Sequence, residues 1–410
     1  MLSSLLFFFS TGVLAAPHSW PTASFSPTYH NNNRTVEAFA SRTYFYAGGQ
    51  YVNATLPGDN TTGQYMTGQI YVEQLLPGNV QHEYPLVFIH GQGQSGTNWL
   101  NTPDGREGWA SHFLRAGYIV YLTDQSQRAR SPWLPTEGNL SAYSTSQIES
   151  QFTAPEKQTP LPYPQAALHT QWPGSGLAGD SVFDAFYASQ MQYQTNTTLI
   201  AQHNNHSYAA LLDIIGPAVV VTHSQSGAFG WQLGDARPEL VKGIVALEPA
   251  GPPFENWVGK PILPGYTAPG LQRPYGVTVL PLKYDPPIGD DASLLLHTTV
   301  AAMSEDLAAC ERQVEPARRL VNLARVPVLV VTSEASYHAV YDDCTVAYLR
   351  QAGVNVSHVP LAEVGIHGNG HFVFSEMNNL EIADAVVAPW VAGVSPVVER
   401  RRSGGWGGRG

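Results

Sequence analysis

A short polar stretch, Thr222-His-Ser-Gln-Ser226, has the residue types of a nucleophile site. It follows Ala218–Val221, a run of apolar and mostly β-branched residues that predicts a buried parallel strand, and a helical pattern follows it. A serine at such a strand-turn-helix junction sits on a strained turn, and small residues two positions away let strand and helix pass closely. Ser226 meets this requirement better than the β-branched Thr222. We predict that Ser224 is the nucleophile, with Ser226 as the alternative. The remaining interpretation is a hydroxyl-rich strand end that has no catalytic role.

A serine hydroxyl needs a histidine base, and that histidine needs a carboxylate that fixes its tautomer and stabilises its charge. In α/β proteins with this kind of turn, the chain order is serine, acid, histidine. His371 lies in a Gly-Asn-Gly loop before the last predicted helix and is the favoured base, because the glycines shape a loop that presents it. His367, four residues earlier, is the alternative base. The remaining interpretation is that both histidines lie on a surface loop and have no catalytic role.

Four carboxylates are candidates for the acid. Glu248 ends the predicted strand that follows the serine, and Glu334 ends the next strand, while Asp342 and Asp343 lie just beyond. Position alone leaves Glu248 and Glu334 about equal, and a glutamate at a strand end can also be a simple cap.

Acyl transfer further requires hydrogen-bond donors for the oxyanion that develops on the substrate. The residue after the nucleophile supplies one backbone N–H, here that of Gln225. The glycine-rich loop His90–Gly96 follows a buried apolar run and supplies the second, from Gln92 or Gly93.

The elements that must position these residues are readable as apolar runs. Alternating residues at 41–47 and 66–74 predict antiparallel edge strands, and continuous runs at 84–90, 118–124, 218–223, 241–247, 326–332 and 354–364 predict buried strands. Helical patterns occupy 109–116, 180–191, 208–215, 304–323, 344–352 and 380–391. Two segments, about 125–215 and 251–325, are too long for simple connections, so we expect insertions that form a cap. Aromatic residues in or near these segments are candidates for an apolar pocket or for packing: Trp99, Trp133, Trp172 and Tyr187.

Composition and terminal segments predict export. Residues 1–16 combine an apolar run with small residues at a cleavage site, as a signal peptide does. This leaves one domain at 17–398 and a low-complexity tail at 399–410 that we expect to be disordered. The two cysteines, Cys310 and Cys344, suit one disulfide that closes a loop of about 34 residues and stabilises by roughly 3–4 kcal/mol. Glycosylation sequons begin at Asn33, Asn53, Asn60, Asn139, Asn196, Asn205 and Asn355.

A formal net charge of −11 argues against a nucleic-acid partner, since phosphate binding needs a basic surface. No segment after residue 16 has the apolar length of a membrane span. We expect a secreted protein that acts on a small molecule.

Four motifs together resemble the α/β-hydrolase fold: His90-Gly-Gln-Gly93, Thr222-His-Ser-Gln-Ser-Gly227, Ile244-Val-Ala-Leu-Glu-Pro249 and Gly368-Asn-Gly-His371. Within that fold the chain is similar, over roughly residues 44–391, to secreted bacterial stereospecific esterases and fungal secreted hydrolases. The resemblance implies a triad acid after the strand that follows the serine, which favours Glu248 over Glu334. It also implies a capped site without cofactor or metal that cleaves carboxylic esters or lactones. Thr222 stands where the family usually has glycine, and Gln92-Gly-Gln94 replaces the adjacent-cysteine disulfide of some bacterial members.

The sequence thus predicts an α/β hydrolase with the triad Ser224, Glu248 and His371 and oxyanion donors at Gln92 and Gln225. Two alternatives stay open, because a fold does not determine a function. One is a lyase or cyclising enzyme of secondary metabolism with the same triad, and the other is a secreted binding protein without activity.

Overall fold

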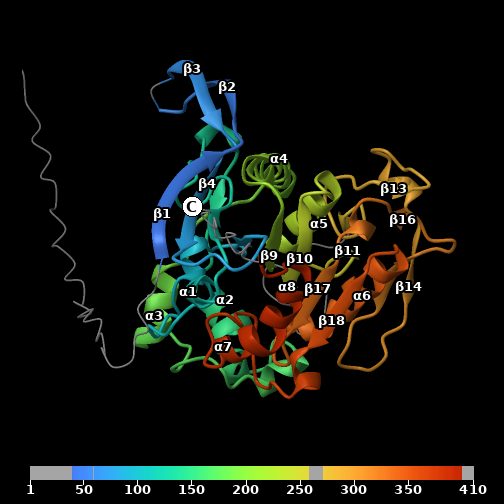
Figure 1. Ribbon diagram of the computed structural model, residues 1–410. Helices are drawn as coiled ribbons and strands as arrows, with labels where there is room; N and C mark the ends of the chain where they lie inside the picture. Colours follow the sequence, from blue (N-terminus) through green and yellow to red (C-terminus); the bar gives the residue numbers. More distant parts are fainter. Residues whose placement is uncertain (1–38, 59, 258–270, 399–410) are drawn as a thin grey trace, which may run out of the picture. The chain divides into compact units, whose positions relative to one another are not determined.

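A sheet of eight strands forms the core of the described chain (Figure 1), as seen in a computed structural model that describes residues 39–58, 60–257 and 271–398. The spatial order is β1 (Phe39–Ala47), β4 (Ile70–Pro77), β6 (Val120–Asp124), β5 (Leu86–Ile89), β9 (Ala218–His223), β10 (Val241–Leu247), β17 (Val328–Thr332) and β18 (Val356–Pro360). The strands β1 and β4 pair in antiparallel fashion, as do β4 and β6, whereas every pairing from β6 to β18 is parallel. The predicted mostly parallel sheet is therefore confirmed.

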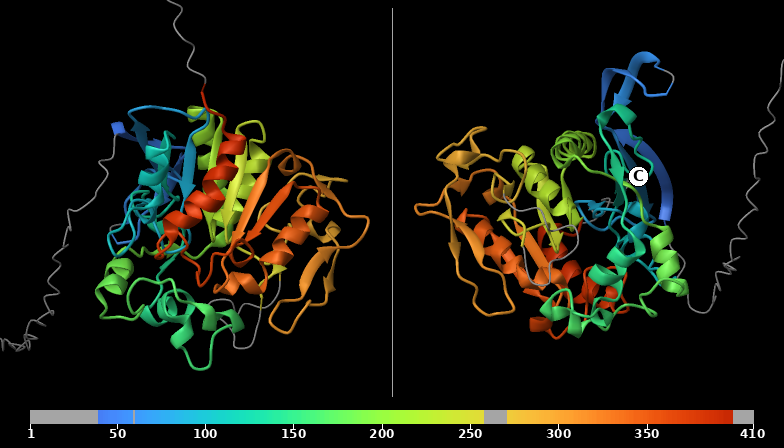
Figure 2. Two further views of the ribbon diagram at one scale, coloured as in Figure 1. Left: turned by 60° about the horizontal axis from the view of Figure 1, so that its bottom comes forward. Right: turned by 180° about the vertical axis from the view of Figure 1, so that it is seen from behind.

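Helices cover both faces of this sheet (Figure 2), which is why its central strands are continuous apolar runs. Side chains alternate between the two faces of a strand. Val219 and Val221 of β9 pack in the same core as α1 (Trp109–Arg115) and α8 (Ala388–Val394). Val220 packs on the other face with α4 (Thr197–Ile215) and α5 (Ser226–Ala236).

The remaining helices are α2 (Thr145–Ile148), α3 (Ser181–Ala188), α6 (Asp342–Gln351) and α7 (Asn379–Ile382). Short π-helical turns at Glu149–Thr153 and Ala383–Val387 continue α2 and α7. Among the described residues, none of the helices combines the length and the apolar character needed to cross a bilayer. The predicted signal peptide, Asn33 and the tail from residue 399 lie outside the described residues.

The first predicted insertion, 125–215, contains α2, α3 and the strand pair β7 (Leu140–Ser141) and β8 (Tyr193–Gln194). Its last part differs from the expectation. There α4 begins at Thr197 rather than near residue 208, and its apolar residues Tyr208, Leu211 and Leu212 pack on the sheet. This helix therefore belongs to the layer that covers the sheet.

The second predicted insertion, 251–325, contains short strands rather than a helix near its end, so the prediction of a helix over 304–323 was wrong. Strand β15 pairs with β14, and Pro316, which has no N–H to donate, separates β15 from β16. The strands are β11 (Phe254–Glu255), β12 (Leu271–Arg273), β13 (Tyr284–Asp285), β14 (His297–Val300), β15 (Cys310–Gln313) and β16 (Arg319–Leu320). A further hairpin, formed by β2 (Gln50–Thr55) and β3 (Thr62–Thr67), follows the last residue of β1 and projects from the sheet there (Figure 1).

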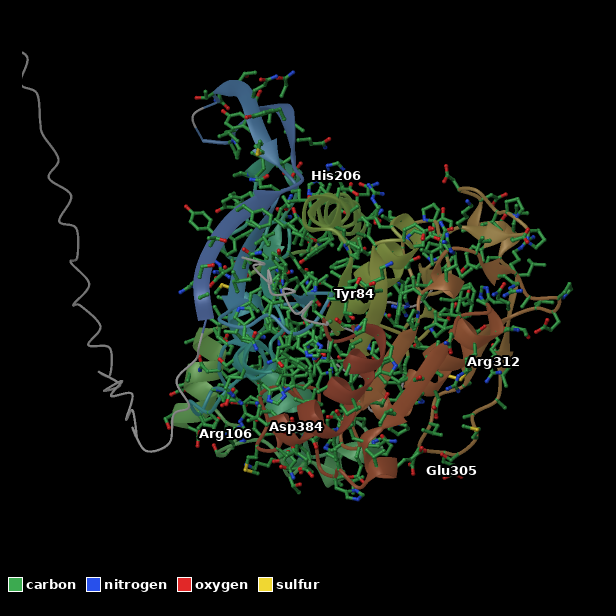
Figure 3. The ribbon with its side chains drawn as sticks, viewed as in Figure 1. Tyr84, Arg106, His206, Glu305, Arg312 and Asp384 are labelled. Carbon is green, nitrogen blue, oxygen red and sulfur yellow. A yellow bond between two sulfur atoms is a disulfide. The ribbon has the colours of Figure 1, made fainter. Side chains whose placement is uncertain are left out.

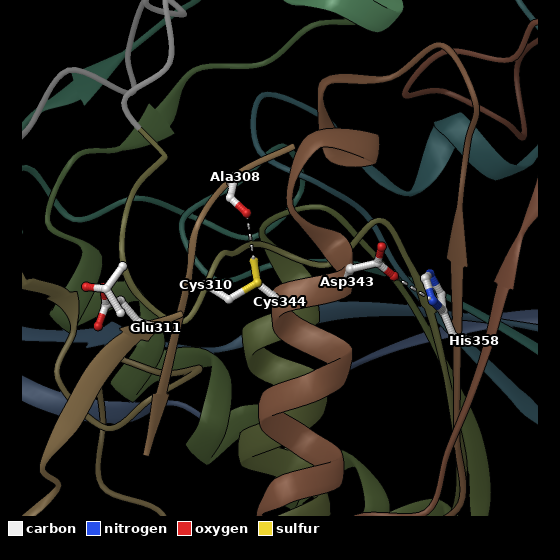
Figure 4. The surroundings of a disulfide bond; sticks show 7 residues. Ala308, Cys310, Glu311, Asp343, Cys344 and His358 are labelled. Carbon is white, nitrogen blue, oxygen red and sulfur yellow. Dashed lines mark hydrogen bonds and ion pairs between the residues drawn. A yellow bond between two sulfur atoms is a disulfide. The ribbon is translucent and has the colours of Figure 1, made fainter. Parts of the chain in front are cut away.

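The predicted disulfide between Cys310 and Cys344 is confirmed, with a Cα–Cα distance of 5.0 Å. It joins β15 of the second insertion to α6 of the central domain (Figure 4). The insertion is thereby fastened covalently to a helix that follows β17, the strand beside Glu248.

Five sequon asparagines, at 53, 60, 139, 196 and 355, are exposed. Asn205 differs, because it lies within α4 and the hydroxyl of its sequon serine, Ser207, is buried and donates a hydrogen bond to the Gly68 carbonyl at 2.6 Å. Glycosylation of these sites stays a prediction.

Candidate active site

Ser224 lies on the sharp turn between β9 and α5, with a left-handed backbone φ of 54°. Its N–H donates to the Leu247 carbonyl at 3.1 Å, and its carbonyl accepts from the N–H groups of Gly227 and Ala250, both at 2.9 Å. A non-glycine residue holds such a conformation only where its surroundings enforce it, as these three bonds do. The strained strand-turn-helix geometry expected of a nucleophile serine is present at Ser224.

Ser226, the alternative nucleophile, is fully buried. Its hydroxyl accepts a hydrogen bond from the His223 N–H at 2.8 Å and lies 2.8 Å from the Ile89 carbonyl oxygen. This hydroxyl ties the turn to β5. Ser224 is partly exposed, so the geometry favours it over Ser226.

Glu248 and His371 form a direct hydrogen bond, with 2.5 Å between Glu248 Oε2 and His371 Nδ1. Glu248 follows β10 directly and also has a left-handed φ, of 46°. Its carboxylate accepts from the Ser333 N–H at 2.8 Å and from the Ser336 hydroxyl at 2.7 Å. Burial raises the pKa of Glu248 to about 8, and the nearby His338 and the two serine donors only partly offset that effect.

The two competing candidates, Glu334 and His367, contact each other instead. Glu334 Oε1 lies 3.1 Å from His367 Nδ1, and its other oxygen accepts from the Gly368 N–H at 2.9 Å. The His367 side chain is 62 % exposed. The pair therefore shapes the loop before His371 at the surface.

His371 is enclosed by other rings. Its ring stacks on Phe152 at 5.3 Å between centroids and on His338 at 4.8 Å, and it lies 4.4 Å from the ring of His223, the neighbour of Ser224. The His223 ring also binds the His371 carbonyl, at 3.0 Å. Burial lowers the pKa of His371 well below its usual range, because the imidazolium would lose its water. Within the described chain His371 makes no hydrogen bond to the Ser224 hydroxyl, and catalytic contacts of this kind often tighten only when substrate binds.

Sequence reasoning did not single out His338, Ser333 or Ser336. Its only signal was their place in the polar run that follows β17, next to Glu334. The His338 Nδ1 atom lies 2.9 Å from Asp342 Oδ1, which shows that Asp342, another candidate acid, serves a second histidine.

Ligand atoms of Glu248, His338 and His371 all lie within 4.8 Å of one another, which is the one such group of three among the residues described. Zinc favours histidine and carboxylate ligands. The Glu248–His371 hydrogen bond, however, joins two of these residues directly, so an ion there would have to break it.

The segment that carries His371 is fastened at several points. Glu376 accepts from the Gly370 N–H at 2.9 Å and from the Asn369 side chain at 2.7 Å, and lies 3.1 Å from His169 Nε2. Arg106, labelled in Figure 3, donates to the Glu376 carbonyl at 3.1 Å and to the Met377 carbonyl at 2.9 Å. The His371 segment is therefore held by groups from the first insertion and from the segment before α1.

The predicted oxyanion loop lies beside Ser224. A side-chain carbon built on Gly91 would be 3.1 Å from Ser224 Cβ, so only glycine allows this approach. In the described part of the chain, the Gln92 and Gln225 N–H groups donate no hydrogen bond. The Gln92 side chain is turned to Tyr143, whose hydroxyl donates to Gln92 Oε1 at 2.8 Å.

The four aromatic residues that were candidates for an apolar pocket pack elsewhere in the structure or lie at its surface. Trp99 is fully buried against Phe88 and Phe374, and Trp172 packs on Phe186. Trp133 is exposed, and the hydroxyl of Tyr187 donates to the Tyr143 carbonyl. The rings that contact His371 include instead those of Phe152 from the first insertion, His338 and His223.

No family model matches this chain. A protein named probable secreted lipase phiG, from Fungal sp. (strain ATCC 74256), is 49 % identical to it over 364 residues, which cover 89 % of this chain and 93 % of that protein. A solved structure described as a novel bacterial esterase has 20 % identity and a TM-score of 0.58, covering 88 % of this chain and 98 % of the other; at that identity the likeness concerns the fold. By its identity to the secreted relative and by its fold, the chain belongs to the α/β-hydrolase family.

Proposed function

We propose that the protein is a secreted serine hydrolase that cleaves carboxylic esters or lactones through an acyl-enzyme intermediate. One observation carries the proposal: the buried 2.5 Å hydrogen bond between Glu248 and His371 lies beside a turn that holds Ser224 in a strained conformation. A serine, a histidine and a carboxylate in this arrangement are the parts of a nucleophile activated by a base. The name of the 49 % identical relative, a probable secreted lipase, supports both export and an ester substrate.

In the first half of the reaction, Ser224 Oγ attacks the acyl carbon while its proton passes to His371 Nε2. The N–H groups of Gln92 and Gln225 donate to the oxyanion of the tetrahedral intermediate. Collapse of that intermediate expels the alcohol, which takes the proton from His371, and leaves the acyl group on Ser224.

In the second half, water replaces the alcohol. His371 accepts a proton from the water as it attacks the acyl carbon, and returns that proton to Ser224 Oγ when the acid is released. Glu248 accepts a hydrogen bond from the His371 Nδ1–H throughout, so it keeps Nε2 free as the base and stabilises the imidazolium.

The test uses the secreted protein, its Ser224→Ala variant and a Ser226→Ala variant as a matched control. We expect a fluorophosphonate probe to label Ser224 and p-nitrophenyl esters to be cleaved by the unsubstituted protein, with both reactions lost in Ser224→Ala. The Ser226→Ala variant should keep the labelling site, although its turn loses the hydrogen bond to Ile89 of β5. Labelling of Ser224 without ester cleavage would favour a lyase or cyclising enzyme, and absence of any labelling would refute the proposal in favour of a binding protein.

A further inference from the structure

Arg128 is a fully enclosed cation in the loop that follows β6. The side chain is 1 % exposed, and the residues on both sides, Gln127 and Ala129, have left-handed φ values of 59° and 48°. Neither is glycine, so the loop is strained on both sides of Arg128. The next residue, Arg130, fixes this conformation through its bonds to Asp124, at 2.6 Å from Nε and 3.1 Å from the backbone N–H. The loop thus holds Arg128 inward at a cost in backbone strain.

The guanidinium makes few contacts for a buried charge. Its one hydrogen bond within the described residues runs from Nη1 to the Gly91 carbonyl at 3.4 Å, and Nε and Nη2 have no partner there. Tyr193 presents its ring at 6.0 Å. A buried cation is expensive to desolvate, and Asp124, the carboxylate whose charge acts on Arg128, is already paired with Arg130. Burial lowers the pKa of Arg128 to about 10, which leaves it charged at neutral pH.

Its acceptor, the Gly91 carbonyl, belongs to the oxyanion loop and has a second donor. His90 Nδ1 lies 2.8 Å from the same oxygen. His90 Nε2 accepts from the Gln125 N–H at 3.1 Å, which assigns the single proton of this buried neutral imidazole to Nδ1. The Gly91 carbonyl is therefore held by two side-chain donors, those of Arg128 and His90.

The orientation of this carbonyl decides where the next N–H points. In a planar trans peptide the C=O of one residue and the N–H of the following residue point in opposite directions. The Gly91 carbonyl is directed to Arg128 and His90, whereas the Gln92 N–H has no acceptor among the described residues. Gly91 itself lies against Ser224, as the 3.1 Å distance of a built side-chain carbon from Ser224 Cβ shows.

We propose that Arg128 is a positioning residue, which holds the Gly91–Gln92 peptide so that the Gln92 N–H faces the oxyanion formed at Ser224. The inference rests on the proposed function, since it concerns the donor assigned there. The cation also polarises the peptide, because a donor on a carbonyl makes the N–H of the same peptide a stronger donor. Without Arg128, the peptide is freer to rotate and turn its carbonyl toward the substrate oxygen.

The experiment compares Arg128→Met, which keeps a long apolar side chain without charge, with Arg128→Lys, which keeps the charge. Arg237→Met is the matched control, because Arg237 forms an exposed ion pair with Asp213. Steady-state kinetics on a neutral p-nitrophenyl ester are corrected for active enzyme by titration with the fluorophosphonate. We expect kcat of Arg128→Met to fall by about 10- to 100-fold, somewhat less than for loss of a whole oxyanion donor, with KM within about threefold. The rate of phosphonylation should fall in parallel, and Arg128→Lys should recover part of both losses.

Three results would overturn the inference. One is an unchanged kcat per active enzyme in Arg128→Met, even where its melting temperature drops, because that describes a purely structural residue. Another is a rise in KM confined to esters that carry a carboxylate, which would make Arg128 a substrate anchor. The third is absence of Ser224 labelling in the unsubstituted protein, which removes the proposed function as well. If Arg128→Met does not fold, Arg128→Lys decides, since a lysine cannot reproduce the guanidinium geometry and should still lower kcat at constant KM.

Discussion

Gly230 of α5 lies directly against Thr222 of β9. A side-chain carbon built on Gly230 would be 3.1 Å from Thr222 Cγ2 and 3.3 Å from Ile244 Cγ2. Thr222 occupies the position two residues before Ser224, the proposed nucleophile, where the family usually has glycine so that strand and helix can pass closely. Here the helix supplies the missing space, because Gly230 has no side chain opposite the Thr222 methyl group.

This contact predicts a coupled pair of substitutions. Gly230→Ala alone should lower the free energy of unfolding by about 1 kcal/mol, because overpacking outweighs the gain in helix propensity. Thr222→Ser keeps the hydroxyl that donates to the Val245 carbonyl and removes the methyl group. In that background, Gly230→Ala should cost less than about 0.5 kcal/mol or stabilise. Urea unfolding of all four proteins measures the coupling, and additive effects would contradict the contact.

A second glycine of α5 should be far less tolerant. A side-chain carbon on Gly227 would lie 2.4 Å from Pro249 Cβ and 2.7 Å from Pro249 Cα, so the backbone beside Glu248 would have to shift. We expect Gly227→Ala to destabilise by about 2 kcal/mol or more and to reduce ester cleavage, because it displaces the acid. Gly393→Ala is the control, since nothing lies within 4 Å of its built side-chain carbon in α8. Equal unfolding midpoints for the two variants would show that the turn adapts.

The central strands were predictable because each of them is a continuous apolar run between turn residues, whereas their spatial order depends on pairing and was not predicted. Val219 and Val221 face one core and Val220 the other, so the run itself indicates burial on both faces. The turn at Ser224 was predictable for the same local reason, since strand, turn and helix follow one another in the chain. The helix predicted at 304–323 failed because β15 is defined by pairing with β14 and by the Cys310–Cys344 bond, neither of which periodicity reports.

The surroundings of the site were less predictable, because they join residues far apart in the chain. Position alone left Glu248 and Glu334 equal, and only the family resemblance favoured Glu248. In space Glu334 binds His367 at the surface, whereas Glu248 binds the buried His371, and this arrangement supports the proposal of Glu248 as the acid. The indication of Arg128 in the sequence was weak, because the sequence shows only a charged residue in a short loop after a buried strand. Nothing in the sequence shows that the Arg128 side chain turns inward.

Activity should rise with pH. Ionised Glu248 accepts a hydrogen bond from the Nδ1–H of His371 and leaves Nε2 free to accept a proton from Ser224. Protonated Glu248 donates to Nδ1 instead, which leaves the imidazole proton on Nε2 and blocks that role. Since burial raises the pKa of Glu248 to about 8, the active form grows as pH rises through that value. We expect kcat/KM on a neutral ester to be half-maximal near pH 8, with an apparent pKa that belongs to the Glu248–His371 pair. A plateau already reached at pH 6 would contradict this.

Stability should have the opposite dependence on pH, through His169. Burial alone would lower the pKa of His169, but its bonds to Glu156 at 2.9 Å and Glu376 at 3.1 Å raise it to about 9. The folded state therefore binds this proton more tightly than the unfolded chain, whose histidine pKa is about 6.5. Its contribution, about 3 kcal/mol, is complete below pH 6.5 and is lost as pH rises through 9. The His169→Gln substitution keeps one hydrogen bond and removes the titrating group. At pH 6 we expect the free energy of unfolding of this variant to be lower than that of the unsubstituted protein. The difference in free energy of unfolding between the two proteins should become smaller by pH 9.5. A difference that is the same at both values would show that His169 acts through packing and not through its charge.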